Sequence, residues 1–143
     1  MSILSTDKMI LDAKAANMNE AIEIAGRLLV DAGHVGEEYI EAMKEREQMQ
    51  TTFMGFGVAI PHGTNEGKKH VKSTGLSIVR IPEGVDFGDG NEVKFLIGIA
   101  AVGDEHMDII QNIALVICEE ENVEKLLAAQ TKEEIIGMFE GGM

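Results

Sequence analysis

One of the four histidines in the sequence follows directly on a short apolar run that ends at a proline. The run is Val58-Ala59-Ile60, and Pro61, His62 and Gly63 come after it. Apolar residues over this length predict a buried strand, and Pro61, which has no backbone donor, should end its pairing. Gly63 allows a sharp backbone turn. We therefore expect the imidazole of His62 at a strand end, on a loop where a reacting group can approach.

His106 is the second candidate, because it falls in the first turn of a helix that Asp104 is expected to cap. Apolar residues then recur on its helical face at Ile110, Ile113 and Ile117. The free amides and positive dipole of a helix start favour an anion such as phosphate and disfavour an imidazolium. A neutral His106 would offer one donor and one acceptor to a phosphoryl oxygen or a second imidazole. For both histidines, a structural place in the core remains the alternative.

Arg46 is the third candidate, because it falls on the apolar face of a helix expected at 37–47. Tyr39, Ile40 and Met43 form that face, and Arg46 lies three residues beyond Met43. One explanation is that its planar cationic fork clamps phosphoryl oxygens. The other is that it snorkels or answers the negative end of its own helix. Two imidazoles and a guanidinium together suit phosphoryl transfer.

Other chemistries find less support in the sequence. His34, in a helix-ending turn, and His70, in a lysine-rich segment, are expected at the surface without a role. No close His or Cys pair has the spacing of a zinc site, and both glycine-rich signatures of nucleotide binding are absent. Cys118, the only cysteine, is expected to be a small core residue rather than a nucleophile. We therefore expect neither a metal nor another cofactor.

The composition argues against several classes of binding partner and indicates a cellular compartment. A chain of 143 residues with 45% hydrophobic content is expected to form one domain over residues 1–143. Its net charge of −13 argues against nucleic acid and anionic membrane surfaces. One cysteine, no export signal and no apolar run of about 20 residues indicate a cytoplasmic protein without membrane insertion.

The pattern of apolar segments and turns predicts interleaved strands and helices. The capping-box spacing of Asn17 and Glu20 predicts a helix that ends at Gly33. The nearly continuous apolar run at 93–100 indicates a central strand covered on both faces. Other expected elements are an edge strand at 9–11, a strand at 76–81 closed by Pro82-Glu83-Gly84, and helices at 123–129 and 132–139. This order favours an α/β sandwich, with helices covering a mostly buried sheet.

At Gly55-x-x-Val58-Ala59-Ile60-Pro61-His62-Gly63-Thr64 the sequence resembles the enzyme IIA component of the phosphoenolpyruvate-dependent sugar phosphotransferase system, mannitol/fructose type. The resemblance extends through 45–47, 81–88 and 97–106, and so covers nearly the whole chain. Among the branches of this family the chain is most similar to the free-standing mannitol one, through Pro-Glu-Gly-Val-x-Phe-Gly and Pro-His-Gly-Thr. The resemblance implies a mixed sheet flanked by helices on both faces.

The resemblance also implies roles for the three candidates. In this family the histidine of the Pro-His-Gly motif accepts a phosphoryl group from the phosphocarrier protein HPr. It passes the group to a cysteine of enzyme IIB, here the mannitol-specific IIB of a membrane permease. That histidine falls on His62, the second active-site histidine on His106, and the phosphate-facing arginine on Arg46. We expect Nε2 of His62 to attack, with Nδ1 held by a hydrogen bond, and no metal or nucleotide to be needed.

Two further expectations stay open at this point. Phe53, Met54 and Phe56 are expected either to form an apolar docking patch for both protein partners or to belong to the core. The alternative functions are a nitrogen-related or fructose-type regulatory protein, controlled by its phosphorylation, and a plain anion-binding domain.

Overall fold

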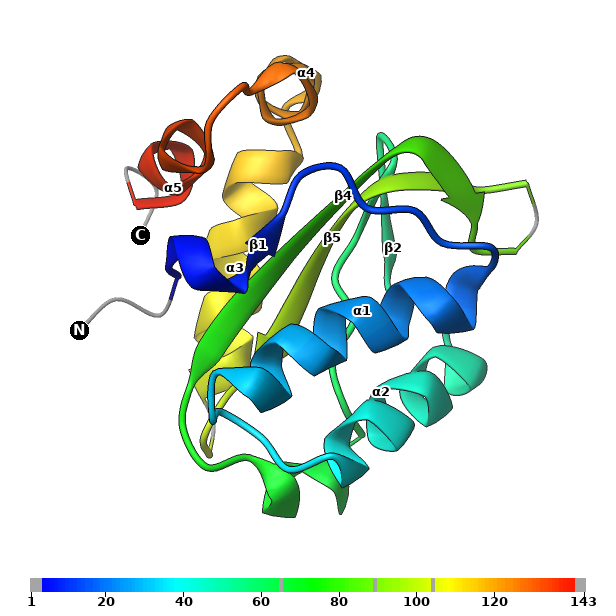
Figure 1. The fold of residues 1–143 in the computed structure, drawn as a ribbon, viewed down its shortest axis with the longest axis vertical. Coiled ribbons are helices and arrows are strands. Elements are labelled where there is room, and N and C mark those ends of the chain that lie inside the picture. Colours follow the sequence, from blue (N-terminus) through cyan, green and yellow to red (C-terminus); the bar gives the residue numbers. More distant parts are fainter. Residues whose placement is uncertain (1–3, 65, 89, 104, 141–143) are drawn as a thin grey trace.

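A mixed sheet of five strands lies between two layers of helices (Figure 1). The strands are β1 (Met9–Ile10), β2 (Phe53–Gly55), β3 (Val58–Ala59), β4 (Gly75–Asp86) and β5 (Glu92–Ala100), in the spatial order β1-β4-β5-β3-β2. Strands β4 and β5 are antiparallel, as are β2 and β3, whereas β1 runs parallel to β4 and β3 runs parallel to β5. The computed structural model describes residues 4–64, 66–88, 90–103 and 105–140, and at positions 105, 106 and 140 it describes the backbone element alone.

The helices are α1 (Met18–Asp31), α2 (Glu38–Met49), α3 (Glu105–Ile117), α4 (Glu120–Ala128) and α5 (Lys132–Glu140). Two short 3₁₀ turns, η1 (Thr6–Lys8) and η2 (Glu66–His70), precede β1 and β4. Helix α1 begins as expected, because Oδ1 of Asn17 accepts the amide of Glu20 at 2.9 Å. Helix α5 begins in the same way, with Oγ1 of Thr131 accepting the amide of Glu134 at 3.2 Å.

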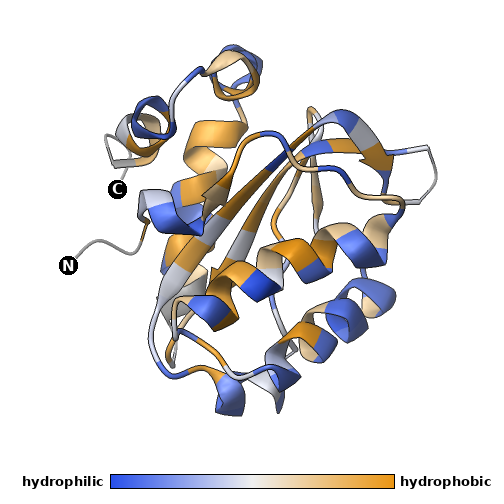
Figure 2. Cartoon of the chain, in the orientation of Figure 1, coloured by the Kyte–Doolittle hydropathy of each residue, from blue (hydrophilic) through white to orange (hydrophobic). Residues whose placement is uncertain are grey.

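Each face of the sheet carries its own apolar core, and helices α1 and α2 cover one face while α3, α4 and α5 cover the other (Figure 1; Figure 2). Along β5, Phe95, Ile97 and Ile99 pack into the core beneath α3, while Leu96 and Ala100 pack beneath α1 and α2. A strand buried on both faces has no polar side to show in its sequence, which explains its unbroken apolar run. The expected fold class, an α/β protein with a mixed sheet flanked on both faces, is confirmed.

The expected edge strand and central strand are also confirmed, as β1 and β5. The expectation that the fourth strand closes at Pro82 is wrong, because β4 continues to Asp86. Its pairing with β5 is interrupted between Arg80 and Val85 and resumes with Val85 opposite Val93. Pro82 and Glu83 are exposed in this interruption, where a residue without an amide donor breaks no ladder bond.

Two side chains lie elsewhere than expected. Cys118 is exposed just beyond the end of α3, so it is not a core residue. His34 is half-buried, with Nε2 at 2.9 Å from Nζ of Lys8 and Nδ1 at 2.8 Å from Oγ of Ser73. Burial and the neighbouring ammonium of Lys8 both lower the pKa of His34.

None of the helices in the described ranges has the length and apolar character needed to cross a bilayer.

Candidate functional site

His62 lies three residues beyond the end of β3, beside Ile99 near the C-terminal end of the central strand β5. The amide of Ile60 donates to the carbonyl of Thr52, and the amide of Ile99 donates to the carbonyl of Pro61 at 2.9 Å. His62 itself forms an isolated parallel bridge with Ile99. Strand β3 does end before Pro61, but pairing does not, because the proline carbonyl still accepts where the ring nitrogen cannot donate.

The His62 ring is fixed by the backbone of its own strand. Its Nδ1 lies 2.9 Å from the carbonyl oxygen of Ile60. Because a carbonyl oxygen only accepts, Nδ1 must carry the proton of this bond, and the lone pair of the neutral ring is then on Nε2. The hydrogen bond that we expected to hold Nδ1 is therefore present, and its partner is a main-chain group.

Gly63 is needed beside His62 because of a neighbouring ring. A Cβ atom at Gly63 would lie 2.5 Å from Cε1 of Tyr39, closer than any real contact. The Tyr39 side chain comes from the first turn of α2, is only 3% exposed, and its hydroxyl accepts the amide of Gly63 at 2.8 Å. The expectation that Gly63 serves a sharp turn is thus replaced by close approach, since Gly63 is not among the residues with positive φ.

A cavity of about 410 Å³ opens beside His62. Its described lining brings together residues from α2, the β2–β3 region, η2, the end of β5 and α3. Two lining residues are cations, Arg46 and Lys68, and no described lining residue is an Asp or Glu. In a chain with 25 acidic and 12 basic residues, that selection of charges indicates a site for an anion.

Arg46 lines this cavity, and its Nη1 donates to the carbonyl of Gln50 at 2.6 Å. Gln50 is the residue that ends α2, so the guanidinium does answer the negative end of its own helix. A guanidinium has five N–H donors, and this bond uses one of them. Both explanations offered for Arg46 are therefore compatible with its geometry.

Lys68 is a cavity residue that sequence reasoning missed. It lies in η2, six residues after His62, and is half-buried. Within the described part of the chain, its ammonium group forms neither an ion pair nor a side-chain hydrogen bond. In the sequence, the adjacent residues Lys68 and Lys69 were the only indication of a cation here. Which of the two reaches the cavity depends on the 3₁₀ turn η2.

The side chain of His106 lies outside the residues that the structure describes, as does Asp104, its expected cap. The backbone places position 106 in the first turn of α3. Met107 and Ile110 of that helix line the cavity beside His62. The start of α3 thus borders the same cavity as Arg46.

The structure places the three residues Phe53, Met54 and Phe56, for which a docking patch and the core were both open, in three different surroundings. Of the three residues proposed, only Met54 lines the cavity, whereas Phe53 packs against the core beneath α1 and α2. Phe56 is exposed in the β2–β3 turn, at a φ of 52°. The exposed apolar lining is instead a set of three methionines, Met49, Met54 and Met107, which are 72%, 42% and 52% exposed. We call these three residues the methionine rim.

The arrangement of donor side chains bears on metal and cofactor binding. Across the described residues, no group of three or more His, Cys, Asp and Glu side chains is placed to hold a metal ion. The charged groups at the cavity favour an anionic ligand, and the Nε2 lone pair of His62 favours an electrophile.

Known proteins resemble this chain over nearly its whole length. The mannitol-specific phosphotransferase enzyme IIA component of Geobacillus stearothermophilus is 50% identical over 139 residues, which cover 97% of this chain and 96% of that protein. The complex of enzyme IIAMTL and phosphorylated enzyme IIBMTL from Escherichia coli matches with a TM-score of 0.90 and 35% identity, covering 96% of both chains. The nitrogen regulatory protein IIA-Ntr from Neisseria meningitidis matches with a TM-score of 0.83 and 26% identity, again covering 96% of both chains.

The family model described as phosphoenolpyruvate-dependent sugar phosphotransferase system, EIIA 2, matches residues 2–141. These residues include the Pro-His-Gly motif and every described residue of the cavity. The chain is therefore a member of the enzyme IIA family of the phosphoenolpyruvate-dependent sugar phosphotransferase system.

Proposed function

We propose that this protein is a phosphoryl carrier that accepts a phosphoryl group from phospho-HPr on His62 and passes it to a cysteine of the mannitol-specific enzyme IIB. The observation that carries the proposal is the bond from Nδ1 of His62 to the Ile60 carbonyl, because it leaves the lone pair on Nε2. The relatives support mannitol, since the one from Geobacillus stearothermophilus is 50% identical and is named mannitol-specific.

Acceptance is an in-line displacement at phosphorus. The lone pair of Nε2 forms the new N–P bond while the bond from phosphorus to HPr breaks, and the electron pair of that bond stays with HPr. Negative charge spreads over the three equatorial oxygens in a loose transition state. The Arg46 guanidinium and the Lys68 ammonium are the described cations that would stabilise this charge, and His106 is assigned the same role.

Discharge reverses the roles of the groups. A thiolate of enzyme IIB attacks phosphorus, the S–P bond forms, and the electron pair of the N–P bond returns to Nε2. In the phosphorylated form Nδ1 keeps its proton and donates it to the hydrogen bond with the Ile60 carbonyl, so the ring carries a positive charge. Breaking the N–P bond of this protonated ring releases a neutral imidazole rather than an imidazolate, which is a better leaving group, so the same hydrogen bond prepares the ring both to accept and to release.

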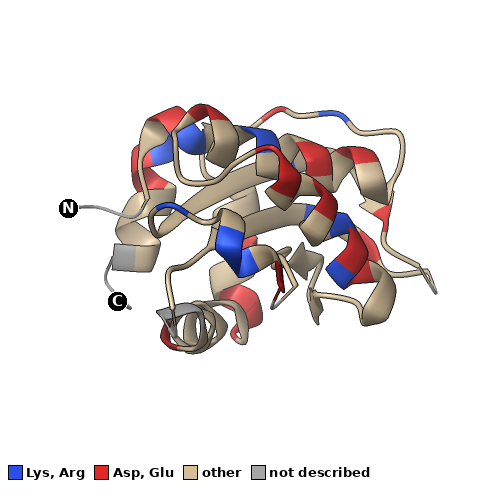
Figure 3. Ribbon diagram, turned by 90° about the horizontal axis from the view of Figure 1, so that it is seen from below, with Lys and Arg blue, Asp and Glu red and all other residues tan. Residues whose placement is uncertain are grey.

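Two protein partners must reach the same histidine in turn, and the methionine rim offers them one apolar contact area. Methionine side chains are unbranched and adaptable, so a single rim can pack against surfaces of different shape. Acidic residues are spread over the helices of the protein (Figure 3). A net charge of −13 would steer a donor or acceptor with a basic surface toward the cavity.

The test is intact mass after incubation with phosphoenolpyruvate, enzyme I and HPr, for the wild type and His62→Ala. We expect one acid-labile phosphoryl group on the wild type only, and onward transfer to a mannitol IIB domain but not to fructose IIB. Full phosphorylation of His62→Ala would contradict the assignment of the nucleophile. Phosphorylation without transfer to mannitol IIB would favour the regulatory or fructose-type alternative, and no phosphorylation would favour a plain anion-binding domain.

A further inference from the structure

One residue of β5, Ile99, holds the backbone on both sides of His62. Before His62, the amide of Ile99 donates to the carbonyl of Pro61 at 2.9 Å. After His62, the amide of Gly63 donates to the hydroxyl of Tyr39, and that hydroxyl donates to the carbonyl of Ile99. Both bonds have a length of 2.8 Å. A regular parallel ladder would take the Gly63 amide directly to Ile99. The Tyr39 hydroxyl is therefore inserted into the ladder at the peptide that follows His62.

The burial of Tyr39 makes this link a fixed one. The ring is 3% exposed and packs on Gly63 so closely that no side chain fits there. Burial raises the pKa of Tyr39 to about 12. The hydroxyl thus stays protonated at neutral pH and can continue to donate to Ile99 while it accepts from Gly63.

We propose that Tyr39 is a positioning residue for phosphoryl transfer, whose hydroxyl fixes the peptide after His62 and so aims Nε2 into the cavity. The inference rests on the proposed function, because it concerns the same nucleophile. The Ile60 carbonyl sets which nitrogen bears the proton, and the Tyr39 hydroxyl sets where the ring is held. In-line displacement is sensitive to placement, since an error of about 1 Å can cost on the order of 100-fold in rate.

The variant that tests the inference is Tyr39→Phe, which keeps the packed ring and removes only the hydroxyl. Its matched control is Ser77→Ala, because Ser77 is fully buried on β4 and its hydroxyl donates to the carbonyl of Ala25 at 2.8 Å, on the face covered by α1. Both changes remove one buried hydroxyl that donates to a carbonyl, but only one of these hydroxyls contacts the His62 loop.

For Tyr39→Phe we expect the single-turnover rate of phosphoryl transfer at saturating phospho-HPr to fall by roughly 10-fold or more. The KM for phospho-HPr should stay unchanged, because so little of Tyr39 reaches the surface. Because a displaced ring loses its bond from Nδ1 to the Ile60 carbonyl, the nitrogen NMR spectrum of His62 should also show a smaller share of the tautomer protonated at Nδ1. Ser77→Ala should match the wild type in all three measurements.

The possible failures are distinguishable. If the wild type accepts no phosphoryl group, the proposed function fails. If the wild type is active and Tyr39→Phe has the same rate and His62 spectrum, or if Ser77→Ala is slowed equally, the positioning role of Tyr39 is overturned. Should Tyr39→Phe not fold, the wild type decides alone: its Tyr39 hydroxyl proton should exchange slowly and show a nuclear Overhauser effect to the Gly63 amide, and absence of that signal overturns the inference.

Discussion

Arg46 occupies the end of α2 with one donor on the Gln50 carbonyl and its side chain at the cavity. We expect Arg46→Ala to lower the rate of phosphoryl transfer from phospho-HPr by on the order of 100-fold, through loss of transition-state charge stabilisation. The free energy of unfolding should change by no more than about 1 kcal/mol, because one partly exposed hydrogen bond is lost. Arg46→Lys should recover part of the rate, since it restores charge without the planar fork.

Transfer rates and urea unfolding, measured on the same preparations, separate the two explanations for Arg46. A variant with normal transfer and a large loss of stability would show that the guanidinium serves the helix end. Slow transfer in a stable protein would show that it serves the phosphoryl group.

Lys68 and its neighbour Lys69 provide a matched pair, because both lie in η2 and either change to Ala removes one positive charge. Lys68 is half-buried at the cavity, whereas Lys69 is exposed and does not line it. We expect Lys68→Ala to slow single-turnover transfer by roughly 10-fold and Lys69→Ala by less than about twofold, since only a nearby cation is poorly screened. Equal effects of the two variants would mean that net charge, not position, matters.

At the residue scale, the sequence singled out His62 and Arg46, and both line the cavity, because a motif and a helical face depend on spacing alone; their roles in transfer stay predictions. The sequence could not identify the hydrogen-bond partner of Nδ1, because that partner is the main-chain carbonyl of Ile60. Every residue has such a carbonyl, so residue types do not show which one accepts. The link from Tyr39 to Gly63 spans 24 positions, so the helical pattern predicted that Tyr39 is buried but not what its hydroxyl contacts.

At the scale of elements, a buried carboxylate joins the end of α2 to the hairpin that leads to His62. Glu47 is 6% exposed and accepts both the amide and the hydroxyl of Thr52. Thr52 in turn accepts the amide of Ile60 through its carbonyl. The helix that presents Arg46 is thereby tied to the strand that presents His62.

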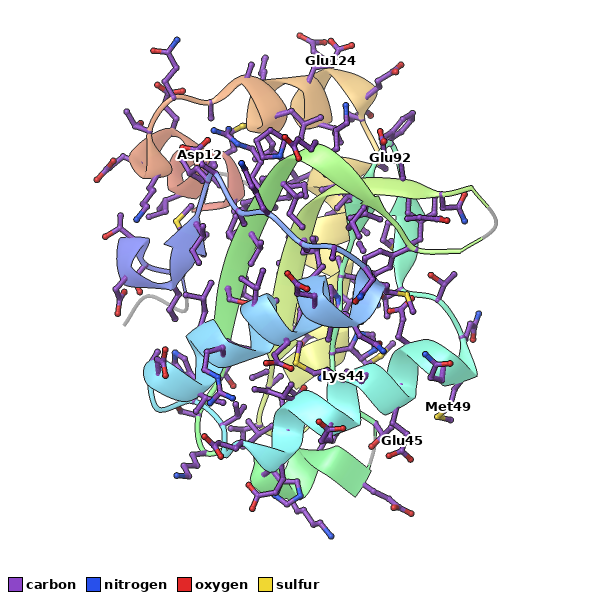
Figure 4. All side chains as sticks on the ribbon, turned by 45° about the vertical axis from the view of Figure 1, so that its right-hand side comes forward. Asp12, Lys44, Glu45, Met49, Glu92 and Glu124 are labelled. Carbon is purple, nitrogen blue, oxygen red and sulfur yellow. The ribbon has the colours of Figure 1, made fainter. Side chains whose placement is uncertain are left out.

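We expect Glu47→Ala to lower the free energy of unfolding by about 1–3 kcal/mol, because it leaves the buried Thr52 amide without its acceptor. Glu47→Gln should cost less, since its amide oxygen can still accept. Glu45→Ala is the control with the same change of charge: Glu45 is exposed on α2, pointing outward in Figure 4, and should change stability by less than about 0.5 kcal/mol. Urea unfolding measures all three, and equal losses at positions 45 and 47 would contradict the link.

Most elements could be predicted because their patterns are strong: α1 has both its cap and its apolar face, and β5 has an unbroken apolar run. The continuation of β4 beyond Pro82 could not, because it depends on an interruption in pairing that β5 must accommodate. The choice between a docking patch and the core for Phe53, Met54 and Phe56 could not be made from the sequence for a similar reason. Phe53 and Phe56 are close to His62 in sequence, but alternation along β2 and the turn after it direct them elsewhere.

For the whole molecule, the acidic surface and the methionine rim make separate contributions to partner binding. Long-range attraction from a net charge of −13 should raise the association rate with a basic partner and weaken as salt increases. The rim acts only on contact, through apolar area removed from water. A substitution in the rim should therefore change the KM for phospho-HPr at every salt concentration.

Met49→Glu tests this division, because Met49 is 72% exposed at the C-terminal end of α2, where Figure 4 shows it pointing outward. Leu115→Glu is the control. Leu115 is 67% exposed on α3 and does not line the cavity, and its replacement by Glu adds the same negative charge. We expect Met49→Glu to raise the KM for phospho-HPr by roughly 10-fold, the equivalent of about 1.4 kcal/mol of lost contact free energy. The rate at saturation should fall as well, but by less than KM rises, because the new carboxylate in the cavity lining also opposes the anionic phosphoryl group. Leu115→Glu should leave both constants within about twofold of the wild type. If the two variants raise KM equally, charge alone governs docking, and the rim has no part in it.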